Sequence, residues 1–557
     1  MSKFLVLRKS DTPLPLTFIL SLFFSYTIGI SFYLKLNPYI LLPFSLVVSI
    51  VYYFRNAFSG KVLVMECAVL AITLSVPWLL IDNTYDGNCY HLPIHNYFQE
   101  GWNPYYSKYL VGSCERWINY YPKFVEFSRY GFYLIKEQFL FIVNISFFLA
   151  SFLVMRKMIL LFMRCSSLKL NILAGVLTVT GTVTVQLFNT YIDGVIGSLI
   201  LILIYFVFIS IKEKKWYLLT SLLIGFAINT KFTTPLMLMP LGFYIAYGIL
   251  KRKVEAKYIT SLLVTVCLAI GVFGRNPFYT NYKEFDHPLH PVMGPSKINI
   301  IDHFLVGELH NDSYVMRYLK SHLATPTNAR FSPGVMSGQL SYSFIDSLSL
   351  VPFTVPDTVI GGHGPLYKYI LLMFLLSLVY FIVMLFIRRN FTFDKFSKYL
   401  ILVFLVSVLI VGVHPGSFWA RYFPHLPSIS LMLVLVLHKK FKTSISKYLS
   451  IILVLLSAIN SLFLVYVVSR NQYELYNIRQ RHVSLLEKNR DYKVNVYYPF
   501  QDKIYGLDIV KSDCRDFYTL NPFHLGLCKN QYDENDLNNK LKSEVLSIKK
   551  DILKWLR

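Results

Sequence analysis

Four ionisable residues lie close together among aromatic side chains in the stretch YDGNCYHLPIHNYFQEGWNPYY, residues 85–106. They are Asp86, His91, His95 and Glu100, and they follow an apolar run that ends at Ile81. A carboxylate at the edge of an apolar layer is partly desolvated, which suits it to act as a general base. Asp86 is therefore a candidate catalytic base. The alternative is a structural role, because aspartate also caps helix N-termini.

A second acid lies in a comparable place further along the chain. In QLFNTYIDGVIGS, Asp193 stands at the start of an apolar run, and the polar residues Gln186, Asn189 and Thr190 precede it. An acid at the end of a membrane span is costly unless it is paired or functional. Helix capping is again the structural alternative. Two acids that arrive at one face from separate connections are more informative than either alone.

Basic residues occur at similar boundaries. They are Lys231 in INTKFTTP, Arg275 in GRNPFYTNYKEFDHPLHPVMG, and Arg421 in HPGSFWARYFPHLP. Arginine binds phosphate oxygens bidentately, and lysine acts as a point charge. Each cation alone is better explained by snorkelling to lipid headgroups. Together with the acids, however, they predict a site for a lipid-linked phosphate.

Histidines accompany these charges. His91 and His95 are four residues apart, which places them on one helical face, and with His287 and Asp86 they could ligate a divalent cation. Their aromatic neighbours favour stacked histidines instead, so we predict no metal site and assign His91 and His287 to substrate binding. The sequence contains no Walker A motif and no Gly-rich nucleotide fingerprint, and we expect no cofactor.

The elements that must position these residues are membrane helices. The chain has 557 residues, 55% of them apolar, and a mean hydropathy of +0.48. Apolar windows long enough to cross a bilayer recur along it, and lipid requires backbone groups to pair within their own segment. We therefore predict an all-α polytopic membrane protein without a cleavable signal peptide. The thirteen predicted spans are residues 14–35, 38–54, 62–81, 137–155, 171–188, 195–211, 217–229, 234–250, 258–274, 366–387, 399–413, 426–437 and 448–468.

The net charge of +24 is interpreted as a topology signal rather than as a sign of nucleic-acid binding. With the N-terminus in the cytoplasm, most lysines and arginines between spans fall inside, and the short outer connections hold only Lys35, Lys231 and Arg421. The loops 82–136 and 275–365, the turn 188–194 and the tail 469–557 then lie outside. Strand-like and helical patterns in the tail predict a small α/β extracytoplasmic domain.

The cysteines agree with this topology. Four of the seven lie in segments predicted to be outside, Cys89 and Cys114 in the first loop and Cys514 and Cys528 in the tail. Disulfides persist in oxidising compartments, so the bridges 89–114 and 514–528 are both compatible with the arrangement. The sequence alone does not determine the pairing.

Six short segments between residues 60 and 430 form an ordered set of motifs. They are DGNCYHLP (86–93), YIDG (191–194), TKFT (230–233), NPFYTN with HPLHPVMG (276–294), GGHGPL (361–366) and FWARYFP (418–424). The set resembles the bacterial membrane glycosyltransferases of the GT-C superfamily, which use polyprenyl-phosphate sugars. The resemblance implies that residues 1–468 form a GT-C-like catalytic module in which Asp86 is the base and Asp193 supports it. The sequence departs from the family at DGNC, where small or apolar residues are expected between the acid and Tyr-His.

The expected function is transfer of a sugar from a polyprenyl-phosphate donor to a cell-surface glycan or lipid-linked acceptor, on the outer face of a bacterial cytoplasmic membrane. Lys231, Arg275 and Arg421 hold the donor phosphate, and membrane lipids surround the protein. One base without a second nucleophilic carboxylate predicts inversion. A flippase or exporter of lipid-linked oligosaccharides is the alternative from another class, although its site would lie near the membrane midplane. A glycan polymerase or ligase would use the same chemistry with a larger acceptor.

Overall fold

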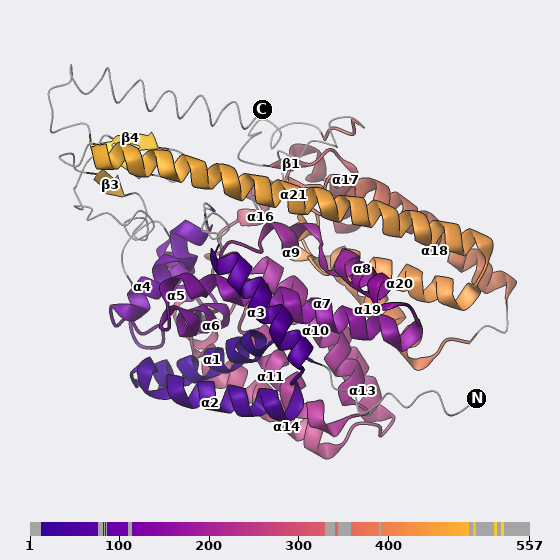
Figure 1. Cartoon of the computed structure of the whole chain (residues 1–557), viewed down its shortest axis with the longest axis horizontal. Helices are drawn as coiled ribbons and strands as arrows, with labels where there is room; N and C mark the ends of the chain where they lie inside the picture. Colours follow the sequence, from indigo (N-terminus) through magenta and orange to yellow (C-terminus); the bar gives the residue numbers. More distant parts are fainter. Residues whose placement is uncertain are drawn as a thin grey trace.

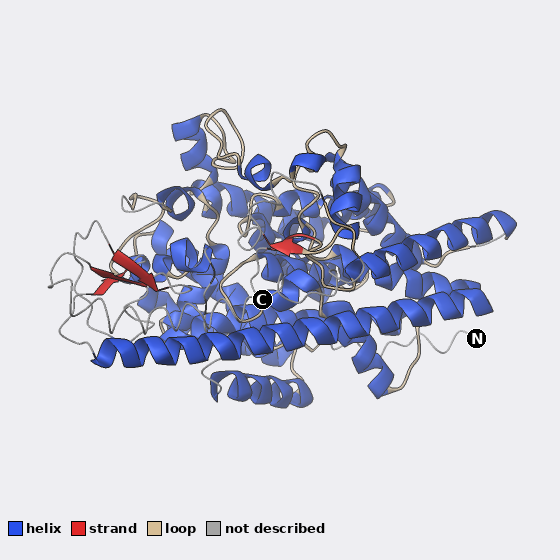
Figure 2. Cartoon of the chain, turned by 90° about the horizontal axis from the view of Figure 1, so that it is seen from above, coloured by secondary structure: helices blue, strands red, loops and turns tan. Residues whose placement is uncertain are grey.

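The computed structural model shows a chain built almost entirely of helices (Figures 1 and 2). It describes residues 13–75, 82, 84, 86–109, 114–328, 340–343, 358–388, 392–488, 494–496, 517–520 and 525–528. Eight helical segments of this part are long and apolar enough to cross a membrane: Leu16–Tyr33, Pro38–Asn56, Glu137–Phe162, Asp193–Ser210, Ala256–Arg275, Tyr367–Ile387, Lys395–Val413 and Ser444–Asn477. This agrees with the predicted all-α membrane protein.

The helices of the first half are α1 (Leu16–Tyr33), α2 (Pro38–Asn56), α3 (Gly60–Ser75), the π-helix η2 (Gly87–His91), α4 (Pro93–Gln99), α5 (Glu115–Tyr120), α6 (Phe124–Tyr133), η3 (Glu137–Phe141), α7 (Ile142–Phe162), α8 (Ser167–Thr178), α9 (Gly181–Val185), α10 (Asp193–Ser210), η4 (Lys214–Trp216), α11 (Tyr217–Ile228), α12 (Thr234–Met237), α13 (Met239–Leu250) and α14 (Ala256–Gly271). The second half continues with η5 (Phe273–Arg275), α15 (Phe278–Phe285), α16 (Ile300–Phe304), η6 (Gly307–Leu309), α17 (Tyr314–Leu323), α18 (Tyr367–Ile387), α19 (Lys395–Val413), η10 (Ala420–Tyr422), α20 (Leu426–Phe441) and α21 (Ser444–Lys488).

Helices occupy all thirteen ranges predicted as spans, with residues 76–81 of the third range outside the described part. Three ranges are interrupted, because 171–188 comprises α8 and α9, 234–250 comprises α12 and α13, and 258–274 comprises α14 and the start of η5. A helix of 12 residues such as α8 is only about 18 Å long, less than the hydrocarbon thickness of a bilayer. The number of complete crossings therefore stays a prediction.

The helix α10 forms the centre of the bundle. Every one of its residues is buried, which is the expected place for a helix that is apolar on all sides. It packs against α7, α9 and α11, and its first residue is Asp193. Outer helices instead expose large apolar side chains, such as Val64, Leu250 and Phe386. Exposed apolar surface of this extent suits contact with lipid.

The helix α21 is the longest element. It continues unbroken past residue 468 to Lys488 and packs along α18, α20, α8 and α9 (Figure 1). The strands β3 (Val494–Val496), β5 (Leu525–Cys528) and β4 (Phe517–Leu520) form an antiparallel sheet in that order. A second antiparallel pair joins β1 (Thr327–Asn328) to β2 (Thr358–Ile360). The division of the chain at residue 469 remains a prediction.

The described residues of the predicted first outer loop, 82–136, include the helices η2, α4, α5 and α6. A disulfide joins Cys89 in η2 to Cys114, which directly precedes α5, with 5.8 Å between their Cα atoms. One of the two expected bridges is therefore present. Cys514, one partner of the other expected bridge, lies outside the described residues.

Removal of this disulfide should destabilise the protein. We expect the double variant Cys89→Ser/Cys114→Ser to lose about 3.5 kcal/mol of unfolding free energy, because the bridge closes a loop of 25 residues. Thermal unfolding of the detergent-purified protein would measure this loss. Cys67→Ala, at an exposed free cysteine of α3, is the control. An unchanged melting temperature in the double variant would contradict the expectation.

Candidate functional site

Four of the predicted site residues meet in one charge cluster, although they come from four separate connections. They are Asp86, Asp193, Lys231 and Arg421. The Nη2 atom of Arg421 lies 3.3 Å from Asp86 Oδ2, and its Nε atom lies 3.1 Å from Asp193 Oδ2. Lys231 forms an ion pair with the other oxygen of Asp193. The order Asp86, Arg421, Asp193, Lys231 therefore alternates negative and positive charge.

The two ends of this charge cluster differ in exposure. The side chains of Asp193 and Lys231 are 1% and 5% exposed, whereas those of Asp86 and Arg421 are 17% and 15% exposed. Burial alone would lower the pKa of Arg421, but the charges of Asp193 and Asp86 outweigh it and raise the pKa well above its usual value. The guanidinium is thus charged and is partly accessible to a ligand.

Aromatic rings surround both cations. The guanidinium of Arg421 lies 4.7 Å from the ring centre of Trp419 and 5.3 Å from that of Tyr191. The ammonium of Lys231 lies 5.0 Å from the ring centre of Tyr422. Cation–π contacts become stronger when water is excluded. These rings therefore help to hold the two cations in place, while Arg421 Nη2 donates to Asp86 and Lys231 donates to Asp193.

Asp82 joins the connection that carries Asp86 to the turn that precedes Asp193. One of its oxygens accepts hydrogen bonds from the backbone N–H of Thr190, at 2.7 Å, and from the hydroxyl of the same residue. The other accepts from the backbone N–H of Thr84, at 2.9 Å, and from its hydroxyl, at 2.6 Å. A Cβ atom at Gly87 would overlap the side chains of Asp82 and Thr84. This close approach explains why glycine follows Asp86 in DGNC.

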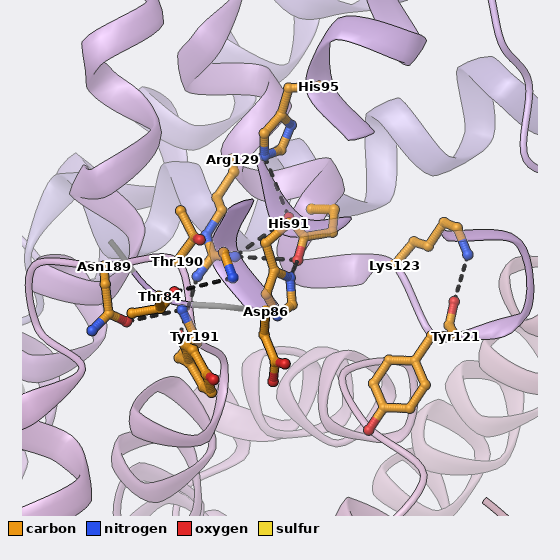
Figure 3. Close-up of polar contacts among 12 residues, drawn as sticks. Thr84, Asp86, His91, His95, Tyr121, Lys123, Arg129, Asn189, Thr190 and Tyr191 are labelled. Atoms are coloured by element: carbon orange, nitrogen blue, oxygen red, sulfur yellow. Dashed lines mark hydrogen bonds and ion pairs between the residues drawn. The ribbon is translucent and has the colours of Figure 1, made fainter. Parts of the chain in front are cut away.

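A second ionic cluster lies beside η2, centred on Glu126 in α6. Figure 3 labels its members His91, His95 and Arg129. The carboxylate of Glu126 lies 2.6 Å from His91 Nδ1, 3.3 Å from His95 Nε2 and 3.1 Å from Arg129 Nη1. All four side chains are buried. Burial alone would raise the pKa of Glu126, but Arg129 and His91 outweigh it and hold the pKa well below its usual value. Glu126 is therefore a buried carboxylate with three partners.

Arg129 connects the Glu126 cluster to the second acid. Its Nη2 donates to Asn144 Oδ1 at 2.9 Å and to the backbone oxygen of Tyr191 at 3.3 Å. Asn144 in turn donates to the backbone oxygens of Gln186, at 2.7 Å, and Asn189, at 2.9 Å. The Glu126 cluster thus reaches η2, which follows Asp86, and the turn that leads to Asp193.

The remaining predicted residues make other contacts. His91 binds Glu126, an arrangement that positions η2. The guanidinium of Arg275 lies 5.0 Å from the ring centre of Tyr106 and 6.0 Å from that of Tyr33. His287 Nδ1 accepts the backbone N–H of Leu289 at 3.2 Å. Among the described residues, no group of three or more histidine, cysteine or acidic residues has an arrangement that could hold a metal ion.

The sequence interpretation missed Asp82, Glu126 and Arg129 as functional residues. A signal for two of them was present, since Glu126 and Arg129 are three residues apart and so share a face of one helix. Comparison of the chain with protein-family models, with curated proteins and with solved structures finds no match.

Breaking the Glu126–Arg129 ion pair should destabilise the protein strongly. We expect Glu126→Gln and Arg129→Met each to cost about 3 kcal/mol, because each removes the oppositely charged partner of a buried ion. The double variant should cost much less than the sum of the two. Thermal or denaturant unfolding in detergent would measure the unfolding free energies of the two single variants and the double variant. Glu284→Gln, at a carboxylate outside the Glu126 cluster, is the control. Strict additivity would show that the pair is not coupled.

Lys123, which precedes α6, should make stability depend on pH. Its ammonium donates to the backbone oxygen of Tyr121 at 2.5 Å, and burial lowers its pKa from 10.5 to about 7. Between these two values the unfolded chain binds more protons at this residue than the folded chain, so folding becomes more favourable as the pH rises. We expect Lys123→Met to show a smaller gain in melting temperature from pH 7 to pH 9 than the unsubstituted protein. Lys297→Met, at an exposed lysine, should retain the full gain in melting temperature between pH 7 and pH 9. Equal gains in the two variants would show that Lys123 does not cause this pH dependence.

Proposed function

We propose that the protein is an inverting membrane glycosyltransferase that transfers a sugar from a polyprenyl-phosphate donor to a glycan or lipid-linked acceptor. The observation that carries the proposal is the position of Arg421 between two carboxylates at the accessible end of a buried charge cluster. The proposal includes the bacterial cytoplasmic membrane, a cytoplasmic N-terminus, an extracytoplasmic C-terminal domain and about thirteen crossings.

The donor phosphate would bind at Arg421. Phosphate and carboxylate oxygens use the same N–H donors of a guanidinium, and bidentate pairing favours a phosphate with several free oxygens. Without a ligand, Asp86 accepts a hydrogen bond from Nη2 of Arg421, and Asp193 forms an ion pair with the same guanidinium. A phosphate can exchange with Asp86 more readily than with Asp193, because Asp86 is the more exposed acid and Asp193 is also bound to Lys231. Donor binding would therefore release Asp86.

The released carboxylate is the proposed general base. Asp86 takes the proton from the acceptor hydroxyl, whose oxygen forms a bond to the anomeric carbon of the donor. The bond from that carbon to the phosphate oxygen breaks, and the phosphate leaves with its additional negative charge stabilised by Arg421 and Lys231. A single displacement inverts the anomeric carbon. This scheme does not need Arg275 or His287.

A transport function is supported less well. Alternating access places a substrate site near the middle of the membrane, between broken helices. Here Asp193 is the first residue of α10, and Asp86 directly precedes η2. Acids at helix ends suit a reaction at the membrane surface. A polymerase or ligase would share the proposed chemistry and would differ in the size of its acceptor.

The two acids should respond differently to neutralisation. We expect Asp86→Asn to lower transfer at least 100-fold with little effect on folding, because asparagine keeps the size but cannot take the proton. Asp193→Asn should lower transfer less and stability more, because it leaves Lys231 buried without its acid. Transfer of radiolabelled sugar from a polyprenyl-phosphate hexose in nanodiscs, together with melting temperatures, would test both.

Asp302→Asn is the matched control, because it neutralises an exposed carboxylate. Unsubstituted transfer rates in Asp86→Asn would remove Asp86 as the base and overturn the mechanism. A larger loss of transfer in a well-folded Asp193→Asn would reverse the two roles.

A further inference from the structure

Two aromatic side chains form a partly exposed pair close to Asp86. Tyr90 in η2 and Trp117 in α5 stack with 6.2 Å between their ring centres and 28° between their planes. Both side chains are only half-buried. Trp117 also meets Tyr121 edge to face, at 5.4 Å. The pair thus presents aromatic surface beside the accessible end of the charge cluster.

The disulfide holds this pair rigidly. Cys89 directly precedes Tyr90, and its partner Cys114 lies three residues before Trp117. The backbone N–H groups of Trp117 and Ile118 donate to the carbonyl of Cys114 at 3.0 and 3.1 Å. Each ring is therefore attached to a backbone segment that the disulfide ties to the other. A binding surface fixed before its ligand arrives loses less conformational entropy on binding.

Asp86 and Tyr90 are neighbours on one helical segment. They are four residues apart, a spacing that places side chains on the same face. Burial, and then the charge of Asp86, raise the pKa of Tyr90 well above its usual value, so its phenol keeps its proton. The pair consequently offers aromatic faces and one hydroxyl donor next to the proposed base. Arg421 reaches Asp86 from another element, η10.

We propose that the Tyr90–Trp117 pair binds a pyranose ring of the acceptor, which makes the acceptor a carbohydrate. A pyranose has an apolar C–H face that stacks on aromatic rings and a rim of hydroxyls that needs polar partners. Asp86 is assigned to the acceptor hydroxyl and Arg421 to the donor phosphate, so a ring held on the face that Tyr90 shares with Asp86 is assigned to the acceptor. This inference rests on the proposed function and adds the class of acceptor.

A different stacked pair shows what a purely structural role looks like. Tyr97 and Tyr109 have 3.6 Å between their ring centres, and Tyr97 is buried in the core. Their substitution should alter stability without selective loss of sugar binding. Tyr90 and Trp117 are more widely spaced, both are more exposed than Tyr97, and Tyr90 adjoins the charge cluster.

Binding of simple sugars to the full-length protein in nanodiscs tests the inference without any transfer reaction. Saturation-transfer NMR would measure binding of the methyl glycosides of glucose, galactose, mannose and N-acetylglucosamine to the protein. The acyclic polyol sorbitol is the control. We expect at least one glycoside to bind and sorbitol not to bind. Trp117→Ala and Tyr90→Ala should weaken that binding about tenfold. Trp117→Phe should retain most of it, and Tyr279→Ala, at an exposed tyrosine elsewhere, should retain all of it.

Two results would overturn the inference. One is the absence of binding by every glycoside, and the other is unchanged binding in folded Trp117→Ala and Tyr90→Ala. Melting temperatures and the intact Cys89–Cys114 bridge confirm that the variants are folded.

A transfer assay separates the acceptor ring from the donor ring. Trp117→Ala should raise the KM for the acceptor and leave the KM for the polyprenyl-phosphate hexose unchanged. A raised KM for the donor alone would overturn the assignment to the acceptor. Failure of the proposed function has a different signature, namely glycoside binding that depends on Trp117 in a protein that transfers no sugar.

Discussion

The buried ion pair between Glu126 and Arg129 is the constraint on which the geometry of the site depends. Neither charge could occupy its position alone, because transfer of an ion from water costs several kcal/mol unless a partner offsets it. Hydrogen bonds extend from this pair to η2 through His91 and to the turn before Asp193 through Asn144. The two acids come from connections about 100 residues apart, yet the hydrogen bonds of one pair of charges on α6 extend to both connections.

The charge cluster beside it is balanced, with two carboxylates and two cations. The site lies at the boundary of an apolar bundle, where an unpaired charge raises the free energy. The balance of charges therefore stabilises the site when no ligand is bound. An arriving phosphate adds negative charge, and proton uptake by Asp86 during the reaction would remove one negative charge. The departing phosphate gains the negative charge that Asp86 loses, so the proposed chemistry leaves the net charge of the occupied site unchanged and moves negative charge toward Arg421 and Lys231.

The sequence predicted the helices well because lipid and the bundle interior impose one simple rule, long apolar segments with paired backbones. It also predicted that Asp86, Asp193, Lys231 and Arg421 share a site, since charges at helix ends must find partners. The sequence could not show that Arg275 and His287 lie apart from these four residues. The distribution of lysine and arginine indicates on which side of the membrane a residue lies, but not where it lies on that side. Glu126 and Arg129 were missed because their segment was interpreted as a loop exposed to water, where charged residues need no explanation.

The folded state of residues 82–136 depends on contacts that no local pattern records. The π-helix η2 places Asp86 and Tyr90 one turn apart, and it closes against Asp82 only because residue 87 is glycine. Short helices of five to ten residues have weak intrinsic signals and are stabilised by tertiary packing. Their sequences are rich in aromatic residues, which pack here into the core around Phe98 and Tyr130.

The length of α21 determines how far its C-terminal end lies from the bilayer. A helix of 45 residues is about 67 Å long, whereas a bilayer with its headgroups is about 40–45 Å thick. Even with a tilt of about 20°, roughly 20 Å of the rod must project beyond the headgroups. Strands β3, β4 and β5 follow in the chain at that projecting end, so the helix acts as a spacer. Whatever these strands contact would be met beyond the lipid headgroups rather than among them.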